Sequence, residues 1–189
     1  MPQLFPTFLK LADRPVLVVG GGPVAYGKIR PLVAAGARVT VVAPVVTDGI
    51  HGLGVRVKAR AFEEADLEGV WFVVAAAPPK VNRRVGRAAE ARRIWVNAVD
   101  DPDAATAYAP ALVRKHGATI AVSTEGRAPA LAGLLREGLE ALLTADLEAW
   151  MGKADQLRAE WRGRSTPMAE RRPQLLESIN RLYRERDTS

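Results

Sequence analysis

Short apolar runs alternate with helical stretches through the first part of the chain. The runs have the length of β-strands and lie at residues 16–19, 38–42, 55–59, 71–75 and 94–97. Between them, residues 25–35 and 80–93 carry apolar side chains at helical spacing. Runs that are apolar on both faces and separated by helices are typical of a parallel sheet covered on both sides. The pattern therefore predicts an α/β fold.

The pattern changes after Asp100. Residues 107–113 and 119–123 are expected to form strands. Only a basic turn at residues 114–117 separates them, so we expect antiparallel pairing rather than another crossover. This change places a domain boundary near residue 113.

The rest of the chain is expected to be helical. Residues 128–143 predict a helix with one apolar stripe, which we interpret as a core or dimer contact. The stripe consists of Leu131, Leu135, Leu139 and Leu142. The charged tail beyond it should form further helices, with breaks at residues 163–167 and at Pro173.

The composition excludes several kinds of active centre. The 189 residues include no cysteine and only two histidines, His51 and His116. Disulfide scaffolds, iron–sulfur clusters, thiolate zinc sites and cysteine nucleophiles are therefore excluded, and we expect no metal site built by the protein. The apolar runs fall far short of the ~20 residues of a membrane-spanning helix, and the first residues do not resemble a signal peptide. We expect a cytoplasmic protein that does not bind membranes.

A glycine-rich loop joins the first strand directly to the first helix. It matches the pattern G-x-G-x-x-[G/A] with Gly20, Gly22 and Ala25. The first glycine allows a tight turn, the second lets a pyrophosphate approach the backbone, and the third small residue lets the helix pack closely on the sheet. The phosphates would lie at the positive end of the helix. We interpret the loop as the dinucleotide site of a Rossmann-type fold; a structural turn in another α/β fold is the alternative.

The end of the second strand departs from the usual dinucleotide site. An acidic residue normally binds the ribose there, but the nearest carboxylate is Asp48. Either backbone groups of residues 43–45 hold the adenosine ribose, or the cofactor is not held in the usual way. No arginine stands there for a 2′-phosphate, which favours NAD over NADP. The expected cofactor-binding positions are Gly20, Gly21, Gly22, Pro23, Val24, Ala43, Pro44, Val45 and Ala76.

The fifth strand ends in a turn with two carboxylates, Asp100 and Asp101, before Pro102. Ligands of open α/β sheets bind beyond the carboxyl ends of the strands, where Asp100 could face both a nicotinamide and a substrate. Its functional role would be that of a general base. The alternative is that both aspartates simply form the turn.

Five motifs along residues 1–145 together carry a family resemblance. They are Leu4–Phe8, Val19–Ala25, Gly36–Pro44, Asn97–Asp100 and Ala121–Pro129. The combination resembles the precorrin-2 dehydrogenase family, which is the dehydrogenase and ferrochelatase module of siroheme synthase. The resemblance implies an NAD-binding Rossmann domain at residues 1–113, a dimerisation region at 114–148 and a helical C-terminal domain at 149–189.

The resemblance also implies a reaction and its residues. Members oxidise precorrin-2 to sirohydrochlorin with NAD⁺, and some also insert Fe²⁺ to give siroheme; the sequence does not separate this route from one that uses Co²⁺. The aspartate that is central to the family falls on Asp100. The loop that approaches the tetrapyrrole falls on residues 123–129, which makes Ser123, Thr124 and Arg127 candidate substrate-binding residues. Ala128 stands where some members have a serine, so any role of that hydroxyl is absent here.

The formal net charge of +6 at pH 7 indicates an anionic partner. Dinucleotide phosphates and the acetate and propionate arms of the tetrapyrrole both fit this charge. A non-catalytic NAD-binding sensor or a nucleic-acid regulator is the alternative class. No helix-turn-helix motif is visible and the positive charge is dispersed over both ends of the chain, so we expect no binding to nucleic acid.

Overall fold

The computed structural model describes residues 3–187, which form two compact units that divide after Ala109. We call residues up to Ala109 the first unit and residues from Pro110 the second unit. The division falls earlier than the boundary expected near residue 113, because Ala111 already begins the first strand of the second unit. The expected separation of residues 114–148 from 149–189 remains a prediction.

The first unit is built on a five-stranded parallel sheet with the strand order β3-β2-β1-β4-β5. Its strands are β1 (Pro15–Val19), β2 (Arg38–Val42), β3 (Arg56–Lys58), β4 (Phe72–Ala75) and β5 (Trp95–Ala98). Its α-helices are α1 (Pro23–Ala34), α2 (Asp48–His51) and α3 (Pro79–Glu90), and two short 3₁₀ helices are η1 (Glu64–Leu67) and η2 (Pro102–Ala104). The predicted Rossmann-type parallel sheet is confirmed.

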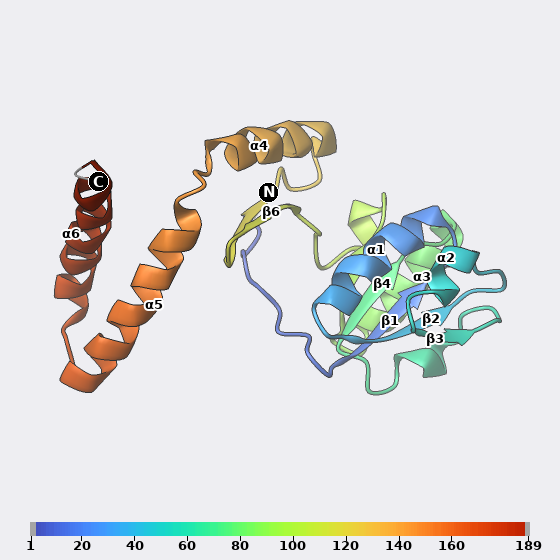
Figure 1. Ribbon diagram of the computed structural model, residues 1–189. Helices are drawn as coiled ribbons and strands as arrows, with labels where there is room; N and C mark the ends of the chain where they lie inside the picture. Colours follow the sequence, from blue (N-terminus) through green and yellow to red (C-terminus); the bar gives the residue numbers. More distant parts are fainter. Residues whose placement is uncertain (1–2, 188–189) are drawn as a thin grey trace. The chain divides into compact units, whose positions relative to one another are not determined.

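Helices cover both faces of this sheet (Figure 1). Val16 and Val18 of β1 pack with α1 and α2 on one face, whereas Leu17 and Val19 pack with α3 and η1 on the other. Because neighbouring residues of a strand point to opposite faces, such a two-sided sheet needs the continuous apolar runs seen in the sequence.

Helix α1 has well-defined ends. Gly22 precedes it and Pro23 occupies its first turn, where a missing N–H costs no hydrogen bond. After the helix, Gly36 adopts a left-handed φ of +75° and donates its N–H to the carbonyl of Val33. The apolar side chains expected on one face of this helix are Ala25, Ile29, Leu32 and Val33; the first three are buried, but Val33 is exposed and does not belong to the core.

A buried carboxylate fixes the segment that follows β3. The Asp66 side chain is 1% exposed, and it accepts hydrogen bonds from Lys58 Nζ at 2.7 Å and from Arg60 at 2.7 and 2.8 Å. The backbone N–H of Glu63 donates a further bond to it at 3.0 Å. The hydrogen bonds from Arg60 outweigh the cost of burial and hold the pKa of Asp66 well below its usual range.

We expect Asp66→Asn to lower the free energy of unfolding at pH 7 by about 2 kcal/mol, because charge-assisted hydrogen bonds are lost. Since the folded pKa of Asp66 is depressed, its contribution is complete above the unfolded pKa of about 3.9 and is lost as the pH falls further. Urea unfolding at several pH values should therefore show a difference in the free energy of unfolding between wild type and variant, and this difference should become smaller below about pH 4. A difference in the free energy of unfolding that does not depend on pH would contradict this role of the ionised Asp66 carboxylate.

The second unit begins with a β-hairpin of β6 (Ala111–Lys115) and β7 (Ala118–Val122). The antiparallel pairing agrees with the sequence prediction, but the turn is shorter than expected and consists of His116 and Gly117. Both residues have positive φ, as a tight turn of this kind requires. Arg114 and Lys115 lie in the strand instead.

Three helices follow the hairpin, α4 (Pro129–Leu142), α5 (Leu147–Arg164) and α6 (Met168–Asp187) (Figure 1). Helices α5 and α6 pair in opposite directions: Trp150 Nε1 donates to the Tyr183 hydroxyl at 3.1 Å, and Trp161 Nε1 donates to Gln174 at 2.6 Å. The predicted break at 163–167 is present between them. The break predicted at Pro173 is wrong, because α6 continues through this proline with the loss of one backbone bond.

The leucine stripe of α4 is largely exposed within the chain. Leu131, Leu135 and Leu142 are 49%, 46% and 80% exposed, and the buried apolar residues described in this unit are Val113 and Ala132. Leu139, the fourth residue of the stripe, is half-buried. Among the described residues, the other three leucines of the stripe therefore do not belong to a buried core. Among residues 3–187, no helix is both long enough and apolar enough to span a bilayer.

Candidate functional site

The sheet of the first unit reverses its strand order between β1 and β4. The chain runs outward from β1 to β2 and β3 on one side, and returns to place β4 and β5 on the other. The loops after β1 and β4 therefore diverge at the carboxyl edge, where α/β sheets bind ligands. The glycine loop and Ala76 follow these two strands.

The three glycines have different surroundings. A Cβ atom at Gly20 would collide with the carbonyl oxygen of Ala76, and one at Gly21 would collide with the carbonyl oxygen of Val45. At Gly22 it would meet nothing within 4 Å among the described residues. The first two glycines therefore let the loop lie against its neighbours, whereas Gly22 faces open space that a ligand can occupy.

Backbone hydrogen bonds hold the loop in this position. Gly20 donates its N–H to the carbonyl of Val42 at 3.0 Å, and Gly21 accepts a bond from the N–H of Thr47 at 2.9 Å. Both bonds connect the loop to the end of β2 and the segment after it. The predicted positions Ala43, Pro44 and Val45 are thus brought beside the glycine loop.

The start of α1 fits the phosphates of a dinucleotide. Its first turn has no acidic side chain, and the N–H groups of Val24 and Ala25 precede any intrahelical acceptor. Ala25 is completely buried, which allows the helix to approach the sheet closely. The N–H groups of Val24 and Ala25 are donors of the kind that a pyrophosphate needs. Open space at Gly22 lets the pyrophosphate approach, and the helix dipole favours its negative charge.

A small pocket of about 180 Å³ lies at this edge of the sheet. Its wall includes Val24 of α1, Ala76 and Ala77 after β4, Asn82 of α3, and the turn Val99–Asp101 after β5. The structure therefore brings the predicted cofactor positions Val24 and Ala76 to the same pocket as the predicted catalytic residue Asp100.

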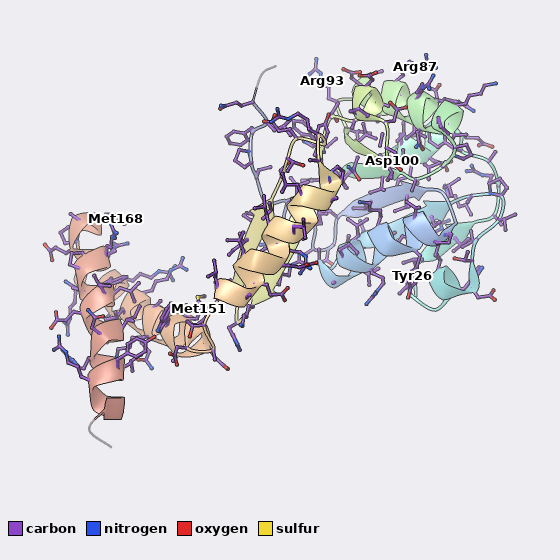
Figure 2. All side chains as sticks on the ribbon, turned by 90° about the horizontal axis from the view of Figure 1, so that it is seen from above. Tyr26, Arg87, Arg93, Asp100, Met151 and Met168 are labelled. Carbon is purple, nitrogen blue, oxygen red and sulfur yellow. The ribbon has the colours of Figure 1, made fainter. Side chains whose placement is uncertain are left out.

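Asp100 lies in the turn that follows β5 and is exposed (Figure 2). Its backbone has a φ of +56°, which is uncommon outside glycine but tolerated by aspartate and asparagine. The preceding residue, Val99, donates its N–H to the carbonyl of Ala75 at 2.9 Å. The carboxylate is thus presented to solvent at the pocket by a backbone that is fixed at the end of β4.

Asn82 lines the same pocket but does not stand out in the sequence. The residue is 3% exposed, and its side chain accepts a hydrogen bond from the N–H of Ala77 at 3.0 Å and donates one to the carbonyl of Val99 at 3.3 Å. The buried face of α3 begins at Asn82 and continues through Val85, Gly86, Ala88 and Ala89. The apolar repeat along residues 80–93 marks Val85 and Ala88, which are buried, but it does not mark Asn82, because a polar residue adds nothing to an apolar pattern.

The candidate substrate-binding residues lie in the second unit, between β7 and α4. Ser123 Oγ accepts the N–H of Glu125 at 3.1 Å, and Thr124 Oγ1 accepts the N–H of Ala128 at 3.2 Å. Arg127 is largely exposed and lies 3.7 Å from the carboxylate of Glu125. The loop is therefore ordered by its own hydroxyl groups and still presents a cation to solvent.

No cluster of three or more histidine or acidic side chains that could hold a metal ion is found within residues 3–187. Asp100 and Asp101 are the carboxylates on the wall of the pocket described above. The candidate site thus combines a dinucleotide cradle with an exposed carboxylate and contains no built metal centre in the described part of the chain.

Comparisons with known proteins agree with this geometry. Residues 7–111 match the model of a family described as putative NAD(P)-binding. The chain is 42% identical over 172 residues to siroheme synthase 1 of Aeromonas salmonicida (strain A449). It is 43% identical over 172 residues to a siroheme synthase of Citrobacter koseri. Each match covers 88% of this chain, which spans only 37% and 38% of the length of these two relatives.

A solved structure described as "SirC, precorrin-2 dehydrogenase" resembles the chain over most of its length. The TM-score is 0.71 at 26% sequence identity, and the match covers 93% of this chain and 89% of the other. The glycine loop fits the pyrophosphate of a dinucleotide, and the family match identifies the cofactor as a nicotinamide dinucleotide.

Proposed function

The chain belongs to the putative NAD(P)-binding family, in agreement with its resemblance to the dehydrogenase module of siroheme synthase, and we propose that it oxidises precorrin-2 to sirohydrochlorin with NAD⁺. One observation carries the proposal most directly. The pocket at the carboxyl edge of the sheet is lined both by the start of α1, next to the dinucleotide cradle, and by Asp100. A carboxylate beside a nicotinamide site suits the removal of a hydride and a proton from one substrate.

In the proposed reaction, precorrin-2 loses one hydride and one proton. Bound NAD⁺ supplies the hydride acceptor. Asp100 takes the proton as a general base and returns it to solvent, to which it is exposed. The glycine loop and the N–H groups of α1 would hold the pyrophosphate, and the backbone of residues 43–45 would hold the adenosine ribose in place of the usual acidic side chain.

Recognition of the substrate would rest on charge. Precorrin-2 is a polycarboxylate, and the chain carries a formal net charge of +6. We assign Ser123, Thr124 and Arg127 to the substrate: Arg127 would bind a carboxylate arm, and the two hydroxyl groups can still donate while they accept backbone bonds. The two siroheme synthases compared above come from bacteria, and as an enzyme that uses NAD⁺ the protein would act in the cytoplasm.

The same site could also serve metal insertion. The macrocycle of sirohydrochlorin provides the nitrogen ligands for Fe²⁺ or Co²⁺, so the protein would need only a base that accepts the displaced pyrrole protons. Asp100 is the candidate for that role. Anaerobic incubation of sirohydrochlorin with each metal ion would test it, and rates equal to those without protein would exclude a chelatase.

The exposed stripe of α4 supports a homodimer. Leucines that are about half exposed or more on one helix face leave apolar area that a second copy could bury. We expect Leu131→Asn combined with Leu135→Asn to convert dimer to monomer, whereas Glu137→Gln on the same helix should leave the dimer intact. Light scattering after size exclusion would decide this. A double variant that remains dimeric would move the interface away from α4.

Anaerobic turnover tests the proposed function. Wild-type protein with precorrin-2 and NAD⁺ should produce the near-UV absorbance of NADH together with the spectrum of sirohydrochlorin, and NADP⁺ should support a slower reaction. NAD⁺ binding without any NADH formation would instead indicate a non-catalytic sensor. Tight binding of DNA with a steep dependence on salt would indicate a nucleic-acid regulator.

A further inference from the structure

The turn that carries Asp100 is held from both sides. On one side, Val99 donates its N–H to the carbonyl of Ala75, the last residue of β4. On the other side, the carbonyl of Val99 accepts a hydrogen bond from Asn82 Nδ2 at 3.3 Å. The peptide groups that lead into Asp100 are therefore fixed to β4 and to α3.

Asn82 also binds the other wall of the pocket. Its Oδ1 accepts the N–H of Ala77 at 3.0 Å, directly after the predicted cofactor position Ala76. One buried amide thus joins the segment after β4 to the turn after β5. Each group of this side chain has a partner, which is expected for a polar group that is 3% exposed.

This tether matters because the Asp100 backbone is in a left-handed conformation. A non-glycine residue with φ of +56° is held at a cost of about 1 kcal/mol or more, and such conformations persist where the surroundings fix them. A second tether lies on the far side of the turn, where Arg83 Nε is 3.4 Å from Asp101 Oδ2. The Arg83 side chain is 67% exposed, so this ion pair contributes little compared with the buried amide.

We propose that Asn82 is a positioning residue, which holds the Asp100 carboxylate at the pocket and so acts on turnover rather than on cofactor affinity. The inference rests on the proposed role of Asp100 as the base. The glycine loop that holds the dinucleotide is fixed by its own bonds to Val42 and Thr47 and does not depend on Asn82.

Two variants test this inference. Asn82→Ala removes both hydrogen bonds, and Asn82→Asp keeps the shape and the acceptor for Ala77 but, when ionised, cannot donate to Val99. In both variants we expect kcat to fall by about 10- to 100-fold, because small displacements of a reacting group have effects of this size. In Asn82→Asp, which keeps the bond from the N–H of Ala77, the dissociation constant for NAD⁺ should change less than about threefold. Asn82→Ala also releases this bond beside Ala76, so a comparison of the two variants separates the turn from the cofactor wall. The amide of Val99 should exchange its hydrogen faster than in wild type, because its turn is released.

Thr106→Val is a matched control. Thr106 Oγ1 accepts the N–H of Val96 at 2.9 Å, so its loss should destabilise β5 without touching the turn. This variant should show a lower Tm with unchanged kcat and unchanged exchange at Val99. Folded Asn82 variants with wild-type kcat and wild-type exchange at Val99 would overturn the inference. A wild-type protein that forms no NADH would overturn the proposed function instead, and the exchange rates would still show whether Asn82 holds the turn.

Discussion

Asp100→Asn is expected to lower kcat for precorrin-2 oxidation by about 10²- to 10⁴-fold, the usual contribution of a general base. Asparagine cannot accept the proton, but it tolerates the left-handed φ of +56° as well as aspartate does. The turn should therefore keep its shape. The affinity for NAD⁺ should stay within about threefold of wild type, because the binding groups of the glycine loop are unchanged.

The measurement is steady-state NADH formation under anaerobic conditions, with NAD⁺ binding followed separately by calorimetry. Asp103→Asn is the matched control, since Asp103 is an exposed aspartate of η2 that does not line the pocket. It should turn over like wild type. An Asp100→Asn variant with undiminished kcat would remove this carboxylate from the mechanism and leave it a turn former.

Gly22→Asp is expected to weaken NAD⁺ binding by at least about 100-fold without lowering stability, because a carboxylate would stand where the pyrophosphate must approach. At this position, an effect on NAD⁺ binding can be separated from an effect on folding. Gly22 precedes α1 with an extended backbone, and a Cβ atom there meets nothing within 4 Å. Aspartate is a favoured residue at that position of a helix and should stabilise α1 slightly.

Two further variants control for this result. Gly22→Ser adds a neutral side chain at the same position, so it should fold normally and lose much less affinity than the aspartate variant. Gly20→Ala, in contrast, should lower the Tm, because its Cβ would collide with the carbonyl of Ala76. Calorimetric binding of NAD⁺ and thermal unfolding separate the two effects. Unchanged affinity in a folded Gly22→Asp protein would contradict the assignment of the loop.

The sequence predicts the sheet well because its strands are buried on both faces. All five apolar runs of the first unit form strands at nearly the expected residues, and the glycine loop lies where the pattern places it. The short helices α2, η1 and η2 were not predicted, because elements of one turn are too short to show a helical period. The break expected at Pro173 fails for another reason: pairing of α6 with α5 outweighs the local cost of one lost hydrogen bond.

The candidate site was only partly predictable. Asp100 and the glycine loop could be found because ligands of α/β sheets bind at the ends of the strands. Asn82 could not be placed, since its two partners are backbone groups of segments that meet only in the fold. The same holds for the exposed leucine stripe of α4, because the pattern alone does not distinguish a core face from an interface.

Transfer of an isotopic label tests the central claim most directly. Precorrin-2 that carries deuterium at the carbon from which the hydride leaves is incubated anaerobically with wild-type protein and NAD⁺. Mass spectrometry of the recovered nicotinamide dinucleotide should then show one deuterium for each sirohydrochlorin formed. Sirohydrochlorin that appears without deuterium in the dinucleotide, or no sirohydrochlorin above the rate without protein, would contradict the account.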